Sequence, residues 1–477
     1  MKKNSISLEV IGGNAESVTG SCTKITTKEH VYLFELGMMQ DGHTPLENYH
    51  LNSKMLQKIK PQEIDYIMIG HLHQDHIGLI PALYERGKCN AKIIVPRGSL
   101  SILKEMWLDS SYINQRDCEI INLKGKNYEP FYTEKTVMQV LNYVEEIESG
   151  EIIPISDELS IRYKNAGHIF LSRQAEVYVK CGSHTKKILF TSDLGNLNTL
   201  ENRVFVEPFE PVTNCNIVIG ECTYSARGRE INKKTLKLDI EKIKTVVDQY
   251  CVDNNHRVLI PSFSLDRTPY ILWILYNLYG KDDSFNVPIL IDSPLANRLL
   301  DCYSSTLEGD AKEKFDDMMS WKNIKRIITS EDSKAAITEK GARVILSSSG
   351  MLTAGRSVKW VQNILSCAED IILFIGYCAE GTLAHKIQHE KEQKTINING
   401  KPYKNKCQIV SLGSFSSHMQ RSDLINYYKS INCEKIYLVH SDKDSKIEFK
   451  HDLEEAISNC SKSTKVTCVN KGTKISL

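Results

Sequence analysis

Four candidate metal ligands stand within six residues in the stretch His71-Leu72-His73-Gln74-Asp75-His76. The apolar run 66–69 precedes it and is typical of a short buried strand. Imidazole and carboxylate groups suit borderline divalent cations, and a loop leaving a strand can turn alternate side chains toward different ions. His71 and His73 can serve one ion, and Asp75 and His76 the other. The pattern favours a metal site over a polar loop with fortuitous histidines.

Further ligands must come from elsewhere in the chain, because one loop cannot complete two metal sites. Three motifs qualify, and each follows an expected strand: Asn165-Ala166-Gly167-His168, Phe190-Thr191-Ser192-Asp193 and Leu438-Val439-His440. Open α/β sheets place their chemistry at such C-terminal strand ends. A lone histidine there is usually structural, but together these motifs supply what the hexapeptide lacks. Asp193 is the natural bridging carboxylate.

Strands and helices alternate along most of the chain. Strand patterns recur at 5–11, 25–36, 66–69, 92–95, 159–164, 174–180, 187–191 and 216–220. From about residue 230 a long amphipathic helix (231–250) opens a second region of short strands at 258–260, 288–291 and 344–347, with helical crossovers. The Lys/Asn-rich stretch 391–406 is the most linker-like segment. The sequence therefore predicts a layered α/β fold with a second α/β unit.

Composition limits the class of protein without naming a substrate. The 477 residues are 41% hydrophobic, which predicts two or three globular domains. The chain contains no run of 18 apolar residues, so the sequence predicts no membrane span. The first residues lack a signal-peptide pattern, so we expect a cytoplasmic protein without a membrane partner. The 14 cysteines form no CxxC pair and are expected to be mostly reduced core thiols. The net charge of +1 predicts no broad basic coat.

The motifs together resemble those of a known family. HLHQDHIG (71–78), NAGHIF (165–170), FTSDLG (190–195) and GGNAESVTGSC (12–22) resemble the metallo-β-lactamase superfamily. The rest resembles its β-CASP branch of RNA-processing nucleases, through ECTY (221–224), PSFS (261–264), DSPLA (292–296), SSGML (348–352), GYCAEGT (376–382), FSSH (415–418) and VH (439–440). The resemblance covers nearly the whole chain. It implies a four-layer αββα metallo-β-lactamase fold (1–208 and 396–477) with an inserted α/β β-CASP domain (209–395).

The resemblance also implies roles for individual residues. The first zinc ion would be held by His71, His73 and His168. The second would be held by Asp75, His76 and His440, with Asp193 bridging the two ions. The catalytic residues would be His418 as general acid, Glu221 orienting it, and Asp75. Manganese is the alternative to zinc at such a His/Asp site.

The implied function is zinc-dependent hydrolysis of RNA phosphodiester bonds by a metal-bridged hydroxide, with single-stranded RNA as substrate. Three alternatives stay open: a DNA nuclease of the same fold, a small-molecule hydrolase, and a non-catalytic RNA-processing subunit. DNA-processing members usually carry valine where this chain has His440, and small-molecule hydrolases lack the inserted domain. Non-catalytic relatives have lost ligands that are all present here. Relatives often form dimers, which leaves a homodimer open.

The chain departs from the family pattern at four places. Glu35 replaces an aspartate that usually braces the metal loop, and Gln74 stands where a small residue is usual. Ser225 replaces a glycine, and Ser441-Asp442 replaces Gly-Glu after the last histidine.

Charged and polar groups of the second region are further candidates for phosphate binding. Residues 348–350 are expected to open a helix at 353–366, and its N-terminus would be either an anion site or a plain N-cap. Arg267, Lys334 and Arg356 are either phosphate partners or surface charges.

Overall fold

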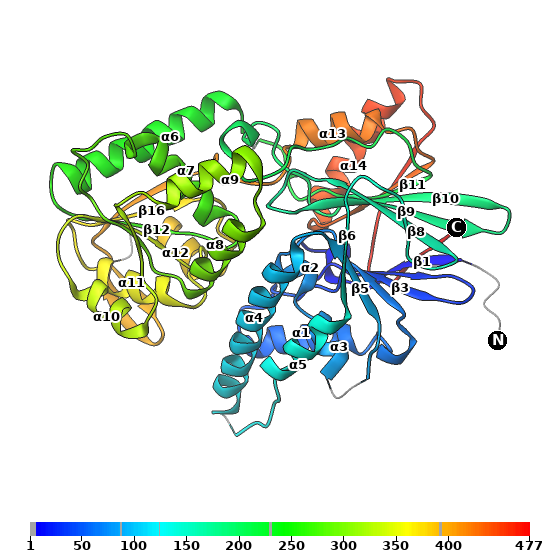
Figure 1. Ribbon diagram of the computed structural model, residues 1–477, viewed down its shortest axis with the longest axis horizontal. Coiled ribbons are helices and arrows are strands. Elements are labelled where there is room, and N and C mark those ends of the chain that lie inside the picture. The colour runs from blue at the N-terminus through cyan, green and yellow to red at the C-terminus, as the bar shows by residue number, and fades with distance from the viewer. Residues whose placement is uncertain (1–5, 86–87, 124, 229–230, 391–393) are drawn as a thin grey trace. The chain divides into compact units, whose positions relative to one another are not determined.

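The computed structural model describes residues 6–85, 88–123, 125–228, 231–390 and 394–477. The chain divides into two compact units (Figure 1). Unit 1 comprises Met1–Leu197, Val206–Glu230 and Ser417–Leu477, and unit 2 comprises Asn198–Phe205 and Ile231–Ser416. The division expected at residues 208 and 395 stays a prediction.

Unit 1 contains two seven-stranded sheets. The strands of the first, in spatial order, are β22 (Thr473–Ser476), β1 (Ser7–Val10), β2 (Thr23–Thr26), β3 (Val31–Phe34), β4 (Tyr66–Met68), β5 (Lys92–Pro96) and β6 (Val144–Ile147). Strands β3 to β6 run parallel, so their carboxyl ends share one edge. The metal loop follows β4 at that edge.

The second sheet brings together segments that are far apart in the chain. Its strands, in spatial order, are β21 (Lys465–Cys468), β20 (Lys435–Val439), β11 (Ile217–Glu221), β10 (His184–Phe190), β9 (Arg173–Cys181), β8 (Leu159–Asn165) and β7 (Ile153–Pro154). Strands β10, β11 and β20 run parallel. Their carboxyl ends therefore carry Asp193, Glu221 and His440 to one edge.

The core of unit 1 lies between the two sheets. Alternating side chains such as Leu8, Ile25, Ile161 and Val177 form one fully buried cluster from both sheets. The chain also forms α1 (Pro45–Leu56), α3 (Ile80–Tyr84), α4 (Ser99–Asn122) and α5 (Glu134–Val140), which lie beside the first sheet (Figure 1). The second sheet is covered by α13 (Arg421–Ser430) and α14 (Lys443–Ser458) over a second cluster. This is the αββα arrangement.

Unit 2 is built on a six-stranded sheet that is parallel throughout. Its strands, in spatial order, are β14 (Ile324–Arg326), β13 (Ile289–Ile291), β15 (Arg343–Ser347), β12 (Arg257–Pro261), β16 (Ile371–Ile375) and β19 (Gln408–Leu412). The crossover helices are α6 (Lys233–Val247), α7 (Arg267–Tyr279), α8 (Pro294–Thr306), α9 (Gly309–Met319), α10 (Ser330–Thr338), α11 (Arg356–Ile364) and α12 (Leu383–His389). Strands such as β12 and β15 are buried throughout, as parallel sheets covered on both faces require.

The predicted α/β fold class, with a metallo-β-lactamase domain and an inserted β-CASP domain, is confirmed. One expected helix starts later than predicted, because Gly355, with a φ of 85°, precedes the first residue of α11, Arg356. The linker-like stretch contains a hairpin of β17 (Thr395–Ile398) and β18 (Lys401–Lys404), while its residues 391–393 lie outside the described part. No helix within the described ranges combines the length and apolar character needed to cross a membrane.

Candidate metal centre

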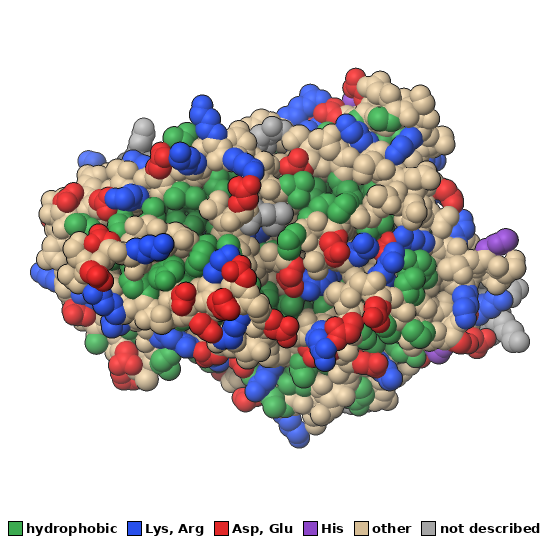
Figure 2. Space-filling model, turned by 45° about the horizontal axis from the view of Figure 1, so that its top comes forward, with side chains coloured by type: hydrophobic (Ala, Val, Ile, Leu, Met, Phe, Trp, Pro, Cys, Tyr) green, Lys and Arg blue, Asp and Glu red, His purple; other side chains and the backbone are tan. Residues whose placement is uncertain are grey.

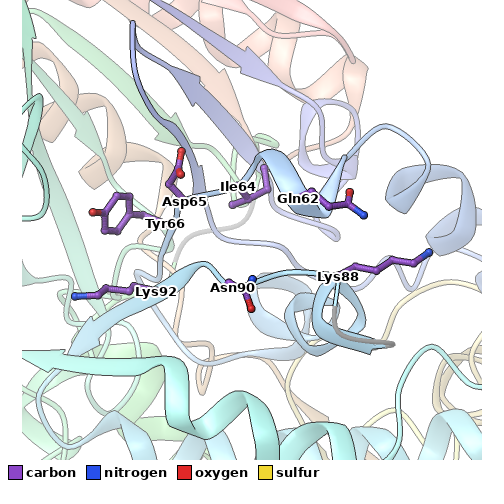
Figure 3. A pocket seen from close by; sticks show the side chains of 7 residues that line it. All are labelled: Gln62, Ile64, Asp65, Tyr66, Lys88, Asn90 and Lys92. Atoms are coloured by element: carbon purple, nitrogen blue, oxygen red, sulfur yellow. The ribbon is translucent and has the colours of Figure 1, made fainter.

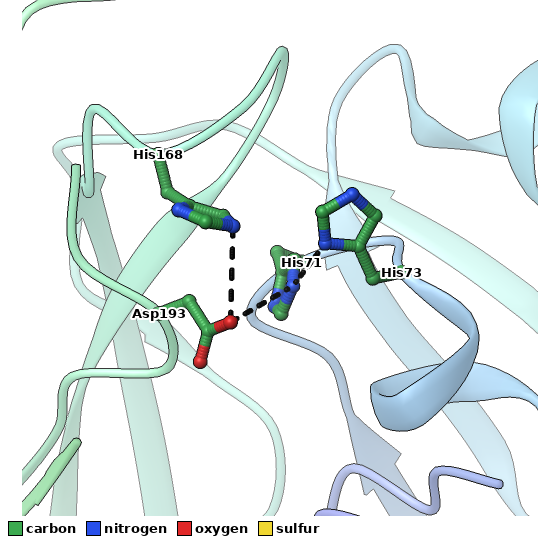
Figure 4. A group of neighbouring side chains, drawn as sticks. All are labelled: His71, His73, His168 and Asp193. Atoms are coloured by element: carbon green, nitrogen blue, oxygen red, sulfur yellow. Dashed lines mark hydrogen bonds and ion pairs between the residues drawn. The ribbon is translucent and has the colours of Figure 1, made fainter. Parts of the chain in front are cut away.

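The predicted ligands converge into two groups at the shared edge of the unit 1 sheets. The first group is His71, His73, His168 and Asp193, whose ligand atoms lie within 4.8 Å of one another. Figure 4 shows that each sheet contributes half of it: His71 and His73 leave the first sheet, and His168 and Asp193 the second. The second group is Asp75, His76, Asp193 and His440, at the same mutual spacing.

Asp193 belongs to both groups and presents one oxygen to each. Its Oδ2 lies 3.7 Å from Nε2 of His71 and 3.7 Å from Nε2 of His168. Its Oδ1 lies 3.5 Å from Nε2 of His76 and 3.5 Å from Nδ1 of His440. Asp75 completes the second group, with Oδ2 3.4 Å from Nε2 of His76 and 3.5 Å from Nε2 of His440. The arrangement matches a carboxylate that bridges two cations.

Two glycines allow the ligand loops to approach the neighbouring strand ends. A Cβ at Gly37 would lie 1.5 Å from the backbone oxygen of Asp75, and a Cβ at Gly195 would lie 1.8 Å from that of Gly167. The carbonyl of Asp75 accepts a hydrogen bond from the Ser21 amide at 2.8 Å. Any side chain at either glycine would push a ligand loop away from its partner.

A buried acid braces the loop from behind. The Oε2 atom of Glu35 lies 2.6 Å from Nδ1 of His76 and accepts a hydrogen bond from the Ser21 hydroxyl at 2.6 Å. Its Oε1 accepts from the Ser192 hydroxyl at 2.7 Å, and Ser192 Oγ also lies 3.0 Å from Nδ1 of His71. Both histidines therefore turn Nε2 toward Asp193, as partners behind metal ligands commonly arrange. Glu35 thus makes the bracing contact that the resemblance implies for the shorter aspartate.

A second acid braces the opposite side of the centre. Thr223 donates from Oγ1 to Glu221 at 2.6 Å, and the same Oγ1 lies 2.8 Å from Nδ1 of His440. Glu221 also accepts from the amides of Leu194 at 3.0 Å and Thr223 at 2.7 Å. The hydroxyl can accept a hydrogen bond from Nδ1–H of a neutral His440 ring. In that tautomer Nε2 carries no proton and can bind a cation.

Backbone strain concentrates around the ligands. Glu35, Ser192 and His440 have φ angles of 62°, 48° and 60°, in the left-handed region that residues other than glycine seldom adopt. Such conformations persist only where the surroundings hold them, and they cluster at functional sites.

The electrostatics of these residues fit a cation. Burial lowers the pKa of His71 well below its usual range, and His76 and His73 lower it further. Burial opposes protonation of His76, yet Glu35, Asp193 and Asp75 hold its pKa well above the usual range. Within the described residues, Asp193 Oδ1 and the Nε2 atoms of His76 and His440 are buried without a hydrogen-bond partner. Buried polar atoms normally have hydrogen-bond partners, so these atoms suit divalent cations, which would displace the proton that His76 otherwise holds.

His418 lies beside the candidate metal centre. Its Nδ1 lies 3.9 Å from Asp193 Oδ2 and 3.9 Å from Glu221 Oε1, and its ring is centred 4.5 Å from that of His168. A backbone bridge between His418 and Gly195 fixes its position. Its side chain is 21% exposed, so it can meet both the centre and solvent.

The other candidates lie apart from the ligands or are engaged elsewhere. Gln74 donates to the Met106 carbonyl at 2.8 Å. Arg356 makes a buried ion pair with Asp292 at 2.7 Å, Arg267 donates to the Ile375 carbonyl, and Lys334 is exposed. Residues 348–350 precede α11 by several residues and do not form its N-terminus. The expected position of these residues at the helix start, whether as an anion site or as an N-cap, is therefore wrong.

Sequence reasoning missed the hydroxyl partners Ser21, Ser192 and Thr223. Each stands inside a motif already noted, next to or near a ligand or brace. Serine and threonine make many kinds of local hydrogen bond, so the only sequence signal for these contacts was their closeness in the chain to a candidate ligand or bracing acid.

A pocket of about 460 Å³ lies in unit 1, away from the candidate metal centre. Asp65, Tyr66 and Lys92 line it at the amino ends of β4 and β5, the ends opposite the metal loop. Figure 3 shows the side chains of Lys88 and Lys92 extending in opposite directions. Its charges do not converge on one ligand.

Family comparisons agree with this geometry. Residues 17–160 match the metallo-beta-lactamase superfamily, residues 268–387 the Beta-Casp domain, and residues 402–461 the Zn-dependent metallo-hydrolase RNA specificity domain. Ribonuclease TTHA0252 of Thermus thermophilus is 26% identical over 91% of this chain and 92% of its own length. The transcription termination factor FttA of Methanocaldococcus jannaschii is 26% identical over 92% of this chain and 67% of its own. An RNase J-like protein of the same organism is 25% identical over 92% and 93%.

A solved structure supports the fold alone. A protein of unknown function from Enterococcus faecalis aligns with a TM-score of 0.56 at 11% identity, covering 99% of this chain and 100% of that one. The three matched domains occur in the order expected from the motifs, and the ligand positions meet in space. The chain therefore belongs to the metallo-β-lactamase superfamily, in its β-CASP branch.

Proposed function

We propose that this chain is a metal-dependent ribonuclease that hydrolyses phosphodiester bonds of single-stranded RNA. The observation that carries the proposal is the pair of ligand groups sharing Asp193, one oxygen toward each. Relatives named as a ribonuclease and as an RNase J-like protein match over nine tenths of the chain.

Two Zn²⁺ ions are the proposed cofactors, with Mn²⁺ as the alternative for a His/Asp donor set. His71, His73 and His168 would hold the first ion, and Asp75, His76 and His440 the second, in a centre that Asp193 bridges. When bound, the ions would supply the positive charge that ionises water near neutral pH and neutralises the phosphate.

His418 is the proposed general acid. Its Nδ1 faces Asp193 and Glu221, so Nε2 is the atom that would give a proton to the leaving oxygen. The Glu221 carboxylate lies 3.9 Å from Nδ1 of His418, where it would orient the imidazole, and it accepts a hydrogen bond from the Leu194 amide beside Asp193. Asp75 is partly exposed at the edge of the second group and would accept a hydrogen bond from the attacking water.

Surface charge gives no independent support for RNA. The net charge is +1, and Lys and Arg side chains are interspersed with Asp and Glu over the face in Figure 2. We therefore expect the centre itself to provide most of the attraction for the reacting phosphate. The cytoplasmic location and a homodimer stay predictions.

The test is cleavage of end-labelled single-stranded RNA and of DNA of matching sequence. Asp193→Ala should lose both bound metal and at least about 100-fold of the RNA cleavage rate, because both ligand groups lose a member. The matched control is Asp157→Ala, which removes a carboxylate that is 76% exposed and lies outside both ligand groups.

Equal cleavage by Asp193→Ala and the wild type would contradict the assigned centre. Faster cleavage of DNA than of RNA would replace the proposed substrate with DNA.

A further inference from the structure

Two cysteines lie opposite each other where β11 and β20 begin. Asn214 and Asn432 form a parallel bridge, and the Cys215 amide donates to the Asn432 carbonyl at 3.1 Å. The regular ladder continues with the same offset from Ile217 and Lys435. Cys215 is therefore aligned with Cys433, and adjacent strands are about 4.8 Å apart. That spacing falls within the range that a disulfide can span.

The two thiols are close enough to shift each other's pKa. Both side chains pack against the same hydrophobic cluster. Both are partly exposed, whereas Cys222 is fully buried. A solute can therefore reach this pair.

The surroundings prepare Cys433 to react first. The neighbouring Cys215 thiol lowers the pKa of the Cys433 thiol and outweighs burial, and the charge of Lys462 lowers it further. The Lys462 ammonium is held by the carbonyls of residues 429–431 at the end of α13. The pKa of Cys215 is raised, chiefly by the neighbouring Cys433 thiol, so Cys215 is the partner that keeps its proton.

We propose that Cys215 and Cys433 form an oxidisable dithiol site, which a hydroperoxide converts into a disulfide between β11 and β20. The Cys433 thiolate attacks the peroxide; the O–O bond breaks, leaving a sulfenic acid on Cys433 and an alcohol, or water when the oxidant is hydrogen peroxide. The Cys215 sulfur then attacks the Cys433 sulfur; the S–O bond breaks, the S–S bond forms, and the sulfenic hydroxyl leaves as water with the Cys215 proton. The peroxide is reduced by two electrons as the two thiols are oxidised.

The disulfide would tie strands β11 and β20 of unit 1 together and would not involve the residues of the candidate metal centre. Glu221 and His440 stand at the other ends of the same strands, six and seven residues from the cysteines and about 20 Å away. Residues 231–416 of unit 2 lie between the two cysteines in the chain, so the bond would close a covalent loop that contains this segment. The proposal is independent of the ribonuclease activity.

The experiment treats the reduced full-length chain with hydrogen peroxide, quenches with catalase, blocks remaining thiols and maps peptides without reduction. A linked peptide containing Cys215 and Cys433 should form before any other thiol is modified, and dithiothreitol should reverse it. Cys433→Ser should lose the linked peptide completely. Lys462→Gln should form it more slowly, because the thiolate loses the nearby charge.

The matched control is Cys460→Ser, which removes the exposed cysteine after α14. It should form the linked peptide at the wild-type rate. Oxidation of Cys460 ahead of the pair in the wild type would overturn the proposal, as would absence of the linked peptide at saturating peroxide. The wild-type map decides the matter even if Cys433→Ser folds poorly.

Discussion

Asp193 and Asp292 occupy similar places in the two units and have opposite surroundings. Both are buried, and each follows a strand of its sheet, β10 or β13. Asp292 accepts hydrogen bonds from Arg356, Trp360 and Ser333, each at 2.7 Å. Asp193 faces imidazole rings, and its Oδ1 has no hydrogen-bond partner among the described residues.

The difference separates an acid with a structural role from an acid that is suited to hold a cation. A buried carboxylate is costly unless its charge is balanced, and unit 2 balances Asp292 with its own arginine, indole and hydroxyl. Around Asp193 the chain supplies histidines whose ring nitrogens can bind a cation, and Nε2 of His76 and of His440 has no hydrogen-bond partner among the described residues. The carboxyl end of a strand therefore does not identify a candidate metal site; a cluster of possible ligands that contains unsatisfied buried atoms does.

The largest effect on stability should follow Asp292→Asn. The substitution removes one partner of a buried ion pair, which costs about 3–5 kcal/mol of unfolding free energy. Three of the four tryptophans, Trp273, Trp321 and Trp360, belong to unit 2, so urea unfolding followed by fluorescence reports on it. Metal content should stay at the wild-type value. Loss of metal without loss of stability would erase the contrast between the two acids.

The next effect should follow Glu35→Gln. The change leaves the side-chain size but removes the charge that orients His76 and receives Ser21 and Ser192. Altering such a partner typically costs about 10–100-fold in metal affinity. Titration with zinc against a competing chelator measures it, and Glu35→Asp, which keeps the charge, should lose less. An unchanged affinity in Glu35→Gln would mean that the brace does not act on the ligands.

The candidate ligands could be proposed from the sequence because each stands in a short local pattern. The HxHxDH hexapeptide and the strand-end positions of His168, Asp193 and His440 needed only spacing and strand order. The bracing could not be predicted to the same extent, because it depends on hydroxyls brought from other strands. Whether Glu35 could replace an aspartate depended on the space behind His76, which only the folded chain reveals.

Unit 2 was less accessible to sequence reasoning. The sequence left Arg356 as either a phosphate partner or a surface charge, but its buried acceptor, Asp292, lies 64 residues away in the chain. The start of α11 was misplaced because a turn through Gly355 precedes it. Long-range pairing and local turn geometry are the two things that composition and periodicity do not encode.

The smallest effect concerns Ser225 and Ser441, both of which stand where the family pattern has glycine. Their hydroxyls are buried and hydrogen-bonded to each other at 2.8 Å, directly after the segments that carry Tyr224 and His440. Replacing either serine with alanine leaves one buried hydroxyl without this partner and should cost about 1–3 kcal/mol. Replacing both should cost less than the sum of the single losses.

A double-mutant cycle from denaturant unfolding of Ser225→Ala, Ser441→Ala and the double variant measures the coupling, which should be about 0.5–1.5 kcal/mol. Additive losses would mean that the two hydroxyls do not depend on each other. Coupling with unchanged metal affinity would show that this pair resembles Asp292, a closed polar contact, although it lies beside the open centre. His440 would then belong to the candidate metal centre, while the next residue, Ser441, would have a structural role only.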